Sequence, residues 1–122
     1  MTLAVRALRG ATTVDSDTAE QVRERTISLL EQMVERNGVD HDDIISVLFT
    51  ATDDIHSIFP ATAARDIGFG DIPLICAREL DIEGSLPRVV RVMAHVETDR
   101  ARSEVAHVYL RGAEVLRRDL AQ

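Results

Sequence analysis

The sequence predicts a mixed α/β (α+β) fold, in which one mixed β-sheet carries helices on one face. Three observations predict it: the chain has 122 residues, the size of one domain; strand-like apolar segments alternate with two helical segments; and no repeat, low-complexity tract or linker interrupts residues 1–122. Because only one face of the predicted sheet receives helices, we expect an oligomer to cover the other face.

The first strand and the long helix are predicted from periodicity and end signals. Residues 3–10 alternate as a strand does. Ser16 or Asp17 is the expected helix N-cap, and Glu20 would complete a capping box with Asp17. The helix should end near residue 37, before Gly38. Its apolar stripe, expected to face the sheet, is Val22, Thr26, Leu29, Leu30, Met33 and Val34.

The rest of the chain predicts one more helix and the remaining strands. Residues 44–51 are a dense apolar run rich in β-branched side chains, typical of a buried strand. Pro60 is suited to the first turn of a short helix that ends by Gly68. Further strands are expected at 72–79 and 88–97, followed by one edge segment each at 107–110 and 113–116.

Composition and charge exclude several classes of function. The net charge is −7, which argues against nucleic acid or an anionic membrane as a partner. All 14 basic residues are arginine, which excludes a Schiff base formed by lysine. The N-terminus has no signal pattern and no apolar run reaches membrane-spanning length, so we expect a cytoplasmic protein.

The usual reactive groups show no catalytic or metal-binding pattern. Cys76 is the only cysteine, so no internal disulfide can form, and without a neighbouring base we interpret it as a small hydrophobic residue. The four histidines lack metal-ligand spacing, and Asp53 with His56 fits a solvated turn better than a metal site. We therefore expect no metal and no cofactor.

Three charged residues continue apolar rows on separate predicted strands, and they carry the first functional hypothesis. Arg9, Glu79 and Arg91 each share a face with apolar neighbours. Charges in such rows are costly to desolvate without a partner or ligand, so they indicate a site for a small multi-carboxylate ligand at the edge of the sheet. A salt bridge between strand ends is the alternative for Arg9 and Glu79. Arg78 alternates to the opposite face, as an ordinary surface charge would.

Five segments together resemble a known family. They are Leu8-Arg9-Gly10-Ala11-Thr12-Thr13, Thr50-Ala51-Thr52-Asp53 through Phe59-Pro60-Ala61, Cys76-Ala77-Arg78-Glu79-Leu80-Asp81, Arg91-Val92-Met93 and His107-Val108-Tyr109-Leu110. Their order and spacing along almost the whole chain resemble the AroH-class monofunctional chorismate mutases. The resemblance implies a homotrimer that forms a pseudo-α/β barrel, with active sites between subunits. It also implies conversion of chorismate to prephenate in phenylalanine and tyrosine biosynthesis, without a cofactor.

The resemblance also assigns site residues. Arg91 corresponds to the residue that contacts the ether oxygen and a carboxylate, and Glu79 to the acceptor for the ring hydroxyl. Arg9 and Tyr109 correspond to donors toward carboxylates. The segment Ile75, Cys76, Ala77, Arg78 and Glu79 would form one wall of the site, and the neighbouring subunit would contribute Phe59, Ala61, Arg65 and Leu74.

Two departures from the family pattern and two rival functions remain open. Thr62 stands where the family can have a lysine, so Arg65 would have to compensate, and the segment ending at Gln122 is shorter than the tail that covers the site in relatives.

The trimeric imine/enamine deaminases are one rival, because they resemble this fold and bind small acids with an arginine. A regulatory module that binds an aromatic amino acid is the other. Neither rival accounts for Arg91 and Glu79 together.

Overall fold

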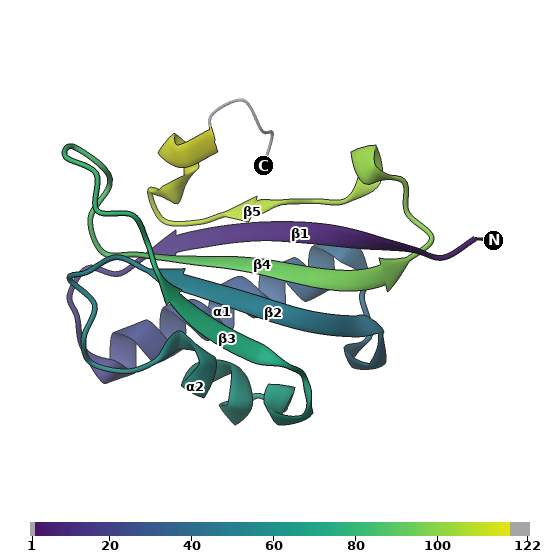
Figure 1. The fold of residues 1–122 in the computed structure, drawn as a ribbon, viewed down its shortest axis with the longest axis horizontal. Helices are drawn as coiled ribbons and strands as arrows, with labels where there is room; N and C mark the ends of the chain where they lie inside the picture. Colours follow the sequence, from purple (N-terminus) through teal and green to yellow (C-terminus); the bar gives the residue numbers. More distant parts are fainter. Residues whose placement is uncertain (1, 118–122) are drawn as a thin grey trace.

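The computed structural model describes residues 2–117, in which two α-helices pack against one five-stranded sheet (Figure 1). The predicted mixed α/β class is therefore confirmed, whereas the predicted short C-terminal tail falls on residues 118–122, outside the described part of the chain. The elements are β1 (Ala4–Thr13), α1 (Ala19–Asn37), β2 (Ile44–Ala51), α2 (Pro60–Asp66), β3 (Leu74–Arg78), β4 (Val89–Thr98) and β5 (Val108–Tyr109).

The sheet is mixed, with strand order β3-β2-β4-β1-β5. β2 runs parallel to β3 and β1 runs parallel to β5, while β4 is antiparallel to both β2 and β1. In this register Arg91 of β4 lies opposite Thr50 of β2, and Met93 lies opposite Arg9 of β1. The charged residues predicted on separate strands are thus brought to neighbouring positions.

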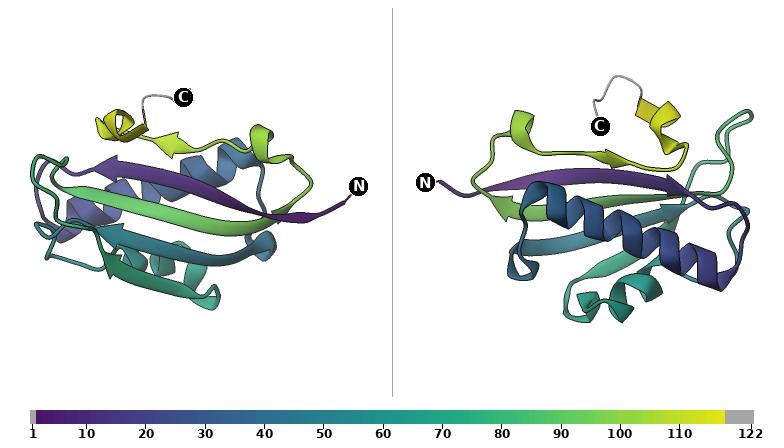
Figure 2. Two further views of the ribbon diagram at one scale, coloured as in Figure 1. Left: turned by 45° about the horizontal axis from the view of Figure 1, so that its top comes forward. Right: turned by 180° about the vertical axis from the view of Figure 1, so that it is seen from behind.

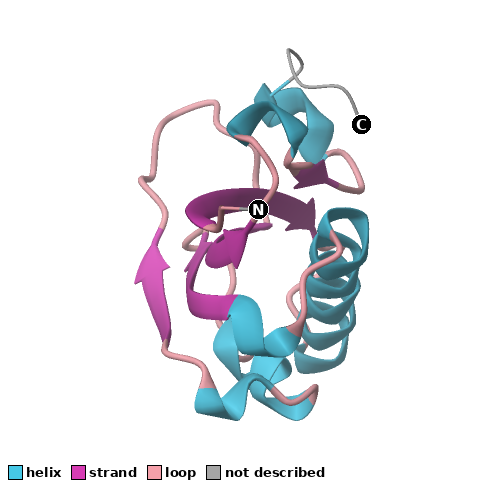
Figure 3. Cartoon of the chain, turned by 90° about the vertical axis from the view of Figure 1, so that its right-hand side faces the viewer, coloured by secondary structure: helices cyan, strands magenta, loops and turns pink. Residues whose placement is uncertain are grey.

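Both α-helices cover the same face of the sheet, as the rear and end views show (Figures 2 and 3). The predicted stripe of α1 faces that side, and its members are buried except Val34, which is partly buried. The core between helices and sheet includes Leu8, Leu29, Leu30, Met33, Val47, Phe49, Val92, Ala94 and Val96. At Gly10 an added Cβ would lie only 2.5 Å from Met33 Sδ, so the missing side chain leaves room for α1 to pack closely behind Arg9.

The other face of the sheet, which we call the open face, carries no α-helix within residues 2–117 (Figure 2). Some of its apolar residues are strongly exposed, since Val5 is 59% and Ile75 is 63% accessible, whereas Ala11 and Val89 are buried in a smaller cluster with Tyr109 and Ala113. The apolar rows that Arg9, Glu79 and Arg91 continue therefore belong to this face and not to the core between helices and sheet. No helix within the described residues is long and apolar enough to cross a membrane.

The start of α1 differs from the prediction. The N-cap is Thr18, whose side chain accepts a hydrogen bond from the backbone N–H of Gln21, and not Ser16 or Asp17. Asp17 is engaged elsewhere, because its carboxylate accepts the backbone N–H groups of His56 and Ser57 at 2.7 and 3.1 Å. The carboxylate that local sequence assigned to the helix thus anchors the loop after β2.

The predicted edge segment at 113–116 is wrong, because residues Ala113–Arg117 form a 3-10 helix. The chain turns at Arg111 and Gly112, which have φ of 54° and 91°. After this turn, Ala113 is buried against Ala11, Val89 and Tyr109 rather than continuing alongside β1. The strand at 107–110 is confirmed, although it is reduced to Val108–Tyr109.

Candidate active site

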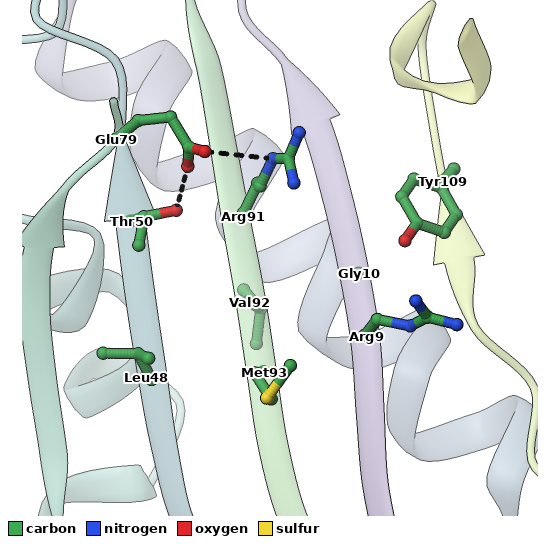
Figure 4. Close-up of a pocket in the computed structure, with 9 residues that line it drawn as sticks. All are labelled: Arg9, Gly10, Leu48, Thr50, Glu79, Arg91, Val92, Met93 and Tyr109. Atoms are coloured by element: carbon green, nitrogen blue, oxygen red, sulfur yellow. Dashed lines mark hydrogen bonds and ion pairs between the residues drawn. The ribbon is translucent and has the colours of Figure 1, made fainter. Parts of the chain in front are cut away.

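A pocket of about 210 Å³ lies on the open face and draws on every strand of the sheet or the residue that follows it (Figure 4). It brings together four predicted site residues, Arg9, Glu79, Arg91 and Tyr109. The rest of its lining consists of Gly10, Leu48, Thr50, Val92 and Met93. The pocket therefore crosses the open face of the sheet, whereas the sequence predicted a site at the sheet's edge.

Strand register explains why these charges converge. Arg91 lies near the start of β4, next to the ends of the antiparallel strands β2 and β1. Glu79 comes directly after β3, and its backbone N–H donates to the carbonyl of Ala51 at 3.0 Å, so that it stays aligned with β2. The backbone of Arg91 is thus held within the strand ladder, and that of Glu79 by one hydrogen bond at the end of the ladder.

The carboxylate of Glu79 and the guanidinium of Arg91 face one another without closing into a hydrogen bond. Glu79 Oε1 lies 3.6 Å from Arg91 Nε, a distance at which the charges attract but which is too long for a hydrogen bond. The Nε atom is buried and has no hydrogen-bond partner among residues 2–117, although the Arg91 side chain as a whole is 43% exposed. A buried donor without an acceptor is costly, so this geometry favours a bound ligand that supplies one.

Thr50 completes the pair in a way that sequence reasoning did not foresee. Its hydroxyl donates to Glu79 Oε2 at 2.5 Å, on the side of the carboxylate away from Arg91 (Figure 4). A hydroxyl near the end of the mainly apolar 44–51 strand was the available signal, but its partner depends on the β2–β3 register.

Arg9 and Tyr109 form the other side of the pocket, on the adjacent strands β1 and β5. Arg9 has no carboxylate within ion-pair distance among residues 2–117, and the Tyr109 hydroxyl lies on the side of its ring that faces Arg9 (Figure 4). The backbone N–H of Arg9 donates to His107 Nδ1 at 3.0 Å, which requires that this nitrogen carry no proton. Burial, together with the nearby positive charges of Arg9 and Arg117, lowers the pKa of His107 below its usual value.

Three residues of the predicted wall lie beside a second, wider depression. Cys76, Ala77 and Arg78 line a pocket of about 600 Å³ together with Phe59, and none of them reaches the pocket of Arg91. Cys76 also packs against the core on the helix side.

Arg78 binds both oxygens of Asp53, with hydrogen bonds of 3.1 and 2.9 Å. These hydrogen bonds lower the pKa of the Asp53 carboxyl. Asp53 is thus occupied as an ion-pair partner. Among residues 2–117, no group of three or more potential ligand side chains is arranged to hold a metal ion.

The remaining predicted residues also lie outside the first pocket. Ile75 is exposed on the open face, and Leu74 is half-buried toward the helices. Ala61 is buried in α2, whereas Arg65 is exposed there and donates to the Thr62 hydroxyl at 3.1 Å. Within one chain, the residues expected from a neighbouring subunit therefore do not meet Arg91.

Comparison with known proteins decides the family. Residues 5–120 match the family model for chorismate mutase type I. The chain belongs to the chorismate mutase type I family. It is 50% identical over 117 residues to the chorismate mutase AroH of Thermus thermophilus, and the match covers 95% of this chain and 96% of that relative. It is 42% identical over 118 residues to the chorismate mutase AroH of Bacillus subtilis strain 168, and that match covers 96% of this chain and 93% of the relative.

A solved chorismate mutase from Clostridium thermocellum has the same fold. It superposes with a TM-score of 0.88 at 49% identity, and the match covers 89% of this chain and 97% of that chain. These findings confirm the predicted resemblance and the predicted chorismate mutase activity, an isomerase activity. The rival functions, imine/enamine deaminase and regulatory module, are not supported by any of these matches.

Proposed function

We propose that this chorismate mutase rearranges chorismate to prephenate in the pocket between Glu79, Arg91, Arg9 and Tyr109, by orientation and electrostatic stabilisation alone. The reaction is an intramolecular Claisen rearrangement, in which one C–O bond breaks and one C–C bond forms within the same molecule. No proton, electron or group leaves the substrate. Catalysis can therefore come from holding a compact conformer and from stabilising the charge that develops during bond breaking.

The buried Nε–H of Arg91 is the observation that carries this proposal. It is a charged donor without an acceptor, held 3.6 Å from a carboxylate that is itself fixed by Thr50. Negative charge grows on the ether oxygen as the C–O bond breaks, so a preorganised guanidinium beside that oxygen stabilises the transition state more than the substrate. The Glu79 carboxylate would accept a hydrogen bond from the ring hydroxyl, and its negative charge would stabilise the positive character of the ring fragment.

Arg9 and Tyr109 would bind the two carboxylates of the substrate. A guanidinium can hold a carboxylate through two parallel hydrogen bonds, and Arg9 has no acidic partner among the described residues that would compete. A small dianion is the ligand that fits two such donors in a protein whose net charge is −7. We expect no metal and no cofactor to take part.

We further propose a trimer in which Phe59, Ala61, Arg65 and Leu74 of one subunit complete the site of its neighbour. Exposed apolar side chains on the open face and at the β3 side support this, because Phe59 is 69% exposed and no α-helix within residues 2–117 covers Ile75. Such residues are typical of an interface between subunits. Light scattering at micromolar concentration should give three chain masses, and a stable monomer with full activity would contradict the shared site.

The activity itself is tested by the loss of chorismate absorbance with purified protein. We expect turnover to prephenate without any added metal or nucleotide. A protein-free control with chorismate and the Arg91→Ala variant identify the enzyme-dependent part of the rate. If native protein bound chorismate without converting it, the catalytic proposal would be wrong.

A further inference from the structure

Thr50 is a polar residue of the pocket with no role so far in the proposed reaction. It lies on β2, next to the centre of the sheet, where the register sets it opposite Arg91 on one side and beside Ala77 on the other. Its hydroxyl donates to Glu79 Oε2 at 2.5 Å (Figure 4). A hydrogen bond to an ionised acceptor is among the strong ones, and it fixes the carboxylate as well as the hydroxyl.

Glu79 needs this support because it lies beyond the end of β3. Its backbone is tied to β2 by the single hydrogen bond to Ala51, and its side chain is 25% exposed. Among the described residues, Thr50 is the one that holds the carboxylate through a hydrogen bond, since Arg91 Nε stays 3.6 Å away. Without Thr50, the carboxylate could rotate toward solvent or close onto Arg91.

A direct hydrogen bond between Glu79 and Arg91 would leave neither the donor of Arg91 nor the facing oxygen of Glu79 open to a ligand. A hydrogen bond between Glu79 Oε1 and Arg91 Nε would occupy the buried donor that now has no partner among the described residues, and it would occupy the carboxylate oxygen that faces this donor. The two charges would then form an ordinary ion pair, with little left for a ligand.

We propose that Thr50 is a positioning residue, which holds Oε2 of Glu79 so that Oε1 and the Nε–H of Arg91 both stay available to the substrate. The inference rests on the proposed function, because it assigns Thr50 an effect that passes through Glu79. It requires a hydroxyl at position 50 and not merely a side chain of that size.

Steady-state kinetics on Thr50→Val and Thr50→Ser separate these requirements. Valine has nearly the shape of threonine and suits a strand, but it removes the donor. We expect Thr50→Val to lower kcat/KM about ten- to a hundredfold, as expected for loss of one hydrogen bond to a charged group, mainly through kcat. Thr50→Ser keeps the donor, so its kcat/KM should stay within about threefold of the native value. This is a smaller change than the loss of one such hydrogen bond would cause. Thr50→Ala provides a second deletion if the valine variant folds poorly.

A double-mutant cycle with Glu79→Ala shows whether the effect passes through the carboxylate. Once Glu79 is absent, Thr50→Val should cost no further activity, with melting temperatures recorded for every variant as a control for folding. Full additivity, or native activity in Thr50→Val, would overturn the role of Thr50 while leaving the proposed function intact. If Glu79→Ala alone kept native activity, the proposed function would fail together with this inference.

Discussion

Two arginine–carboxylate pairs lie side by side at the end of β3 and differ in how far they are satisfied. Arg78 closes on Asp53 with two hydrogen bonds of 3.1 and 2.9 Å, and the Arg78 side chain is 83% exposed. Arg91 faces Glu79 at 3.6 Å with a buried Nε that has no acceptor. The residues are of the same types, and Arg78 and Glu79 are adjacent in sequence.

From this difference we infer that the functional group is the arginine donor that has no partner among the described residues. Exposed ion pairs such as Arg78–Asp53 contribute little to stability, and the Nε–H of Arg78 already donates to a carboxylate oxygen. At Glu79, Thr50 holds one oxygen and the ladder to Ala51 holds the backbone, so the pair stays open. We therefore expect replacement of the two arginines to have unequal consequences.

The largest expected effect is that of Arg91→Ala. Loss of one preorganised donor in a site shielded from water typically costs about 2.7–4 kcal/mol of transition-state stabilisation, a hundred- to a thousandfold in kcat. Arg91 also supplies a full charge, so the loss should reach the upper end of that range, with a smaller change in KM. Arg91→Lys should recover part of the rate, because the charge survives without the planar fork.

Arg78→Ala is the matched control, because it removes an arginine whose Nε–H already donates to the carboxylate beside it. Its kcat should stay within about threefold of native, as expected for a residue outside the reacting centre. Equal losses of kcat in Arg91→Ala and Arg78→Ala, in proteins with unchanged melting temperature, would contradict the difference between the two pairs.

A smaller effect is expected from Thr62→Lys, which adds a cation on α2 at the position where the family resemblance implies a lysine. If that charge attracts the substrate carboxylate equally in the ground and transition states, KM should fall about two- to fivefold while kcat hardly changes. Thr62→Met is the control for chain length without charge. A large rise in kcat would show instead that the position acts on the transition state.

The smallest effect concerns His107, which holds the backbone of Arg9. Since its folded pKa lies below the usual 6.5, neutral His107 contributes stability that is complete above pH 6.5 and is lost as the pH falls through the folded pKa. The melting temperature should therefore drop between pH 7.5 and 5. His107→Asn, whose side-chain oxygen can accept from Arg9 but does not titrate, should lose less over that range. An identical drop in both proteins would remove His107 as the cause.

Much of this arrangement could be predicted from alternation along single strands. Arg9, Glu79 and Arg91 stood out because each continues a row of apolar residues, and the structure brings all three to one pocket. The site was predicted at the edge of the sheet and instead crosses its open face, because alternation alone says neither the order of the strands nor which side of the sheet the helices cover. The family resemblance, and not periodicity, supplied Tyr109.

What could not be predicted depends on contacts between distant segments. Thr50 and Glu79 are 29 residues apart, and their hydrogen bond follows from the β2–β3 register. Asp17 fitted the local pattern of a helix cap, but the backbone of residues 56 and 57 competes for its carboxylate and leaves Thr18 as the cap. The turn at Arg111 and Gly112 likewise redirected a segment that looked like a strand.

The most direct test of the account is to observe the arginine Nε–H groups by ¹H–¹⁵N NMR while the product prephenate is added. All basic residues of the chain are arginine, and the signals of Arg91 and Arg78 can be assigned from their lysine variants. We predict that the Arg91 Nε–H signal shifts on saturation, because it gains an acceptor, while that of Arg78 stays in place. A shift of Arg78 with no change at Arg91 would contradict the claim that the unpaired donor is the one that meets the ligand.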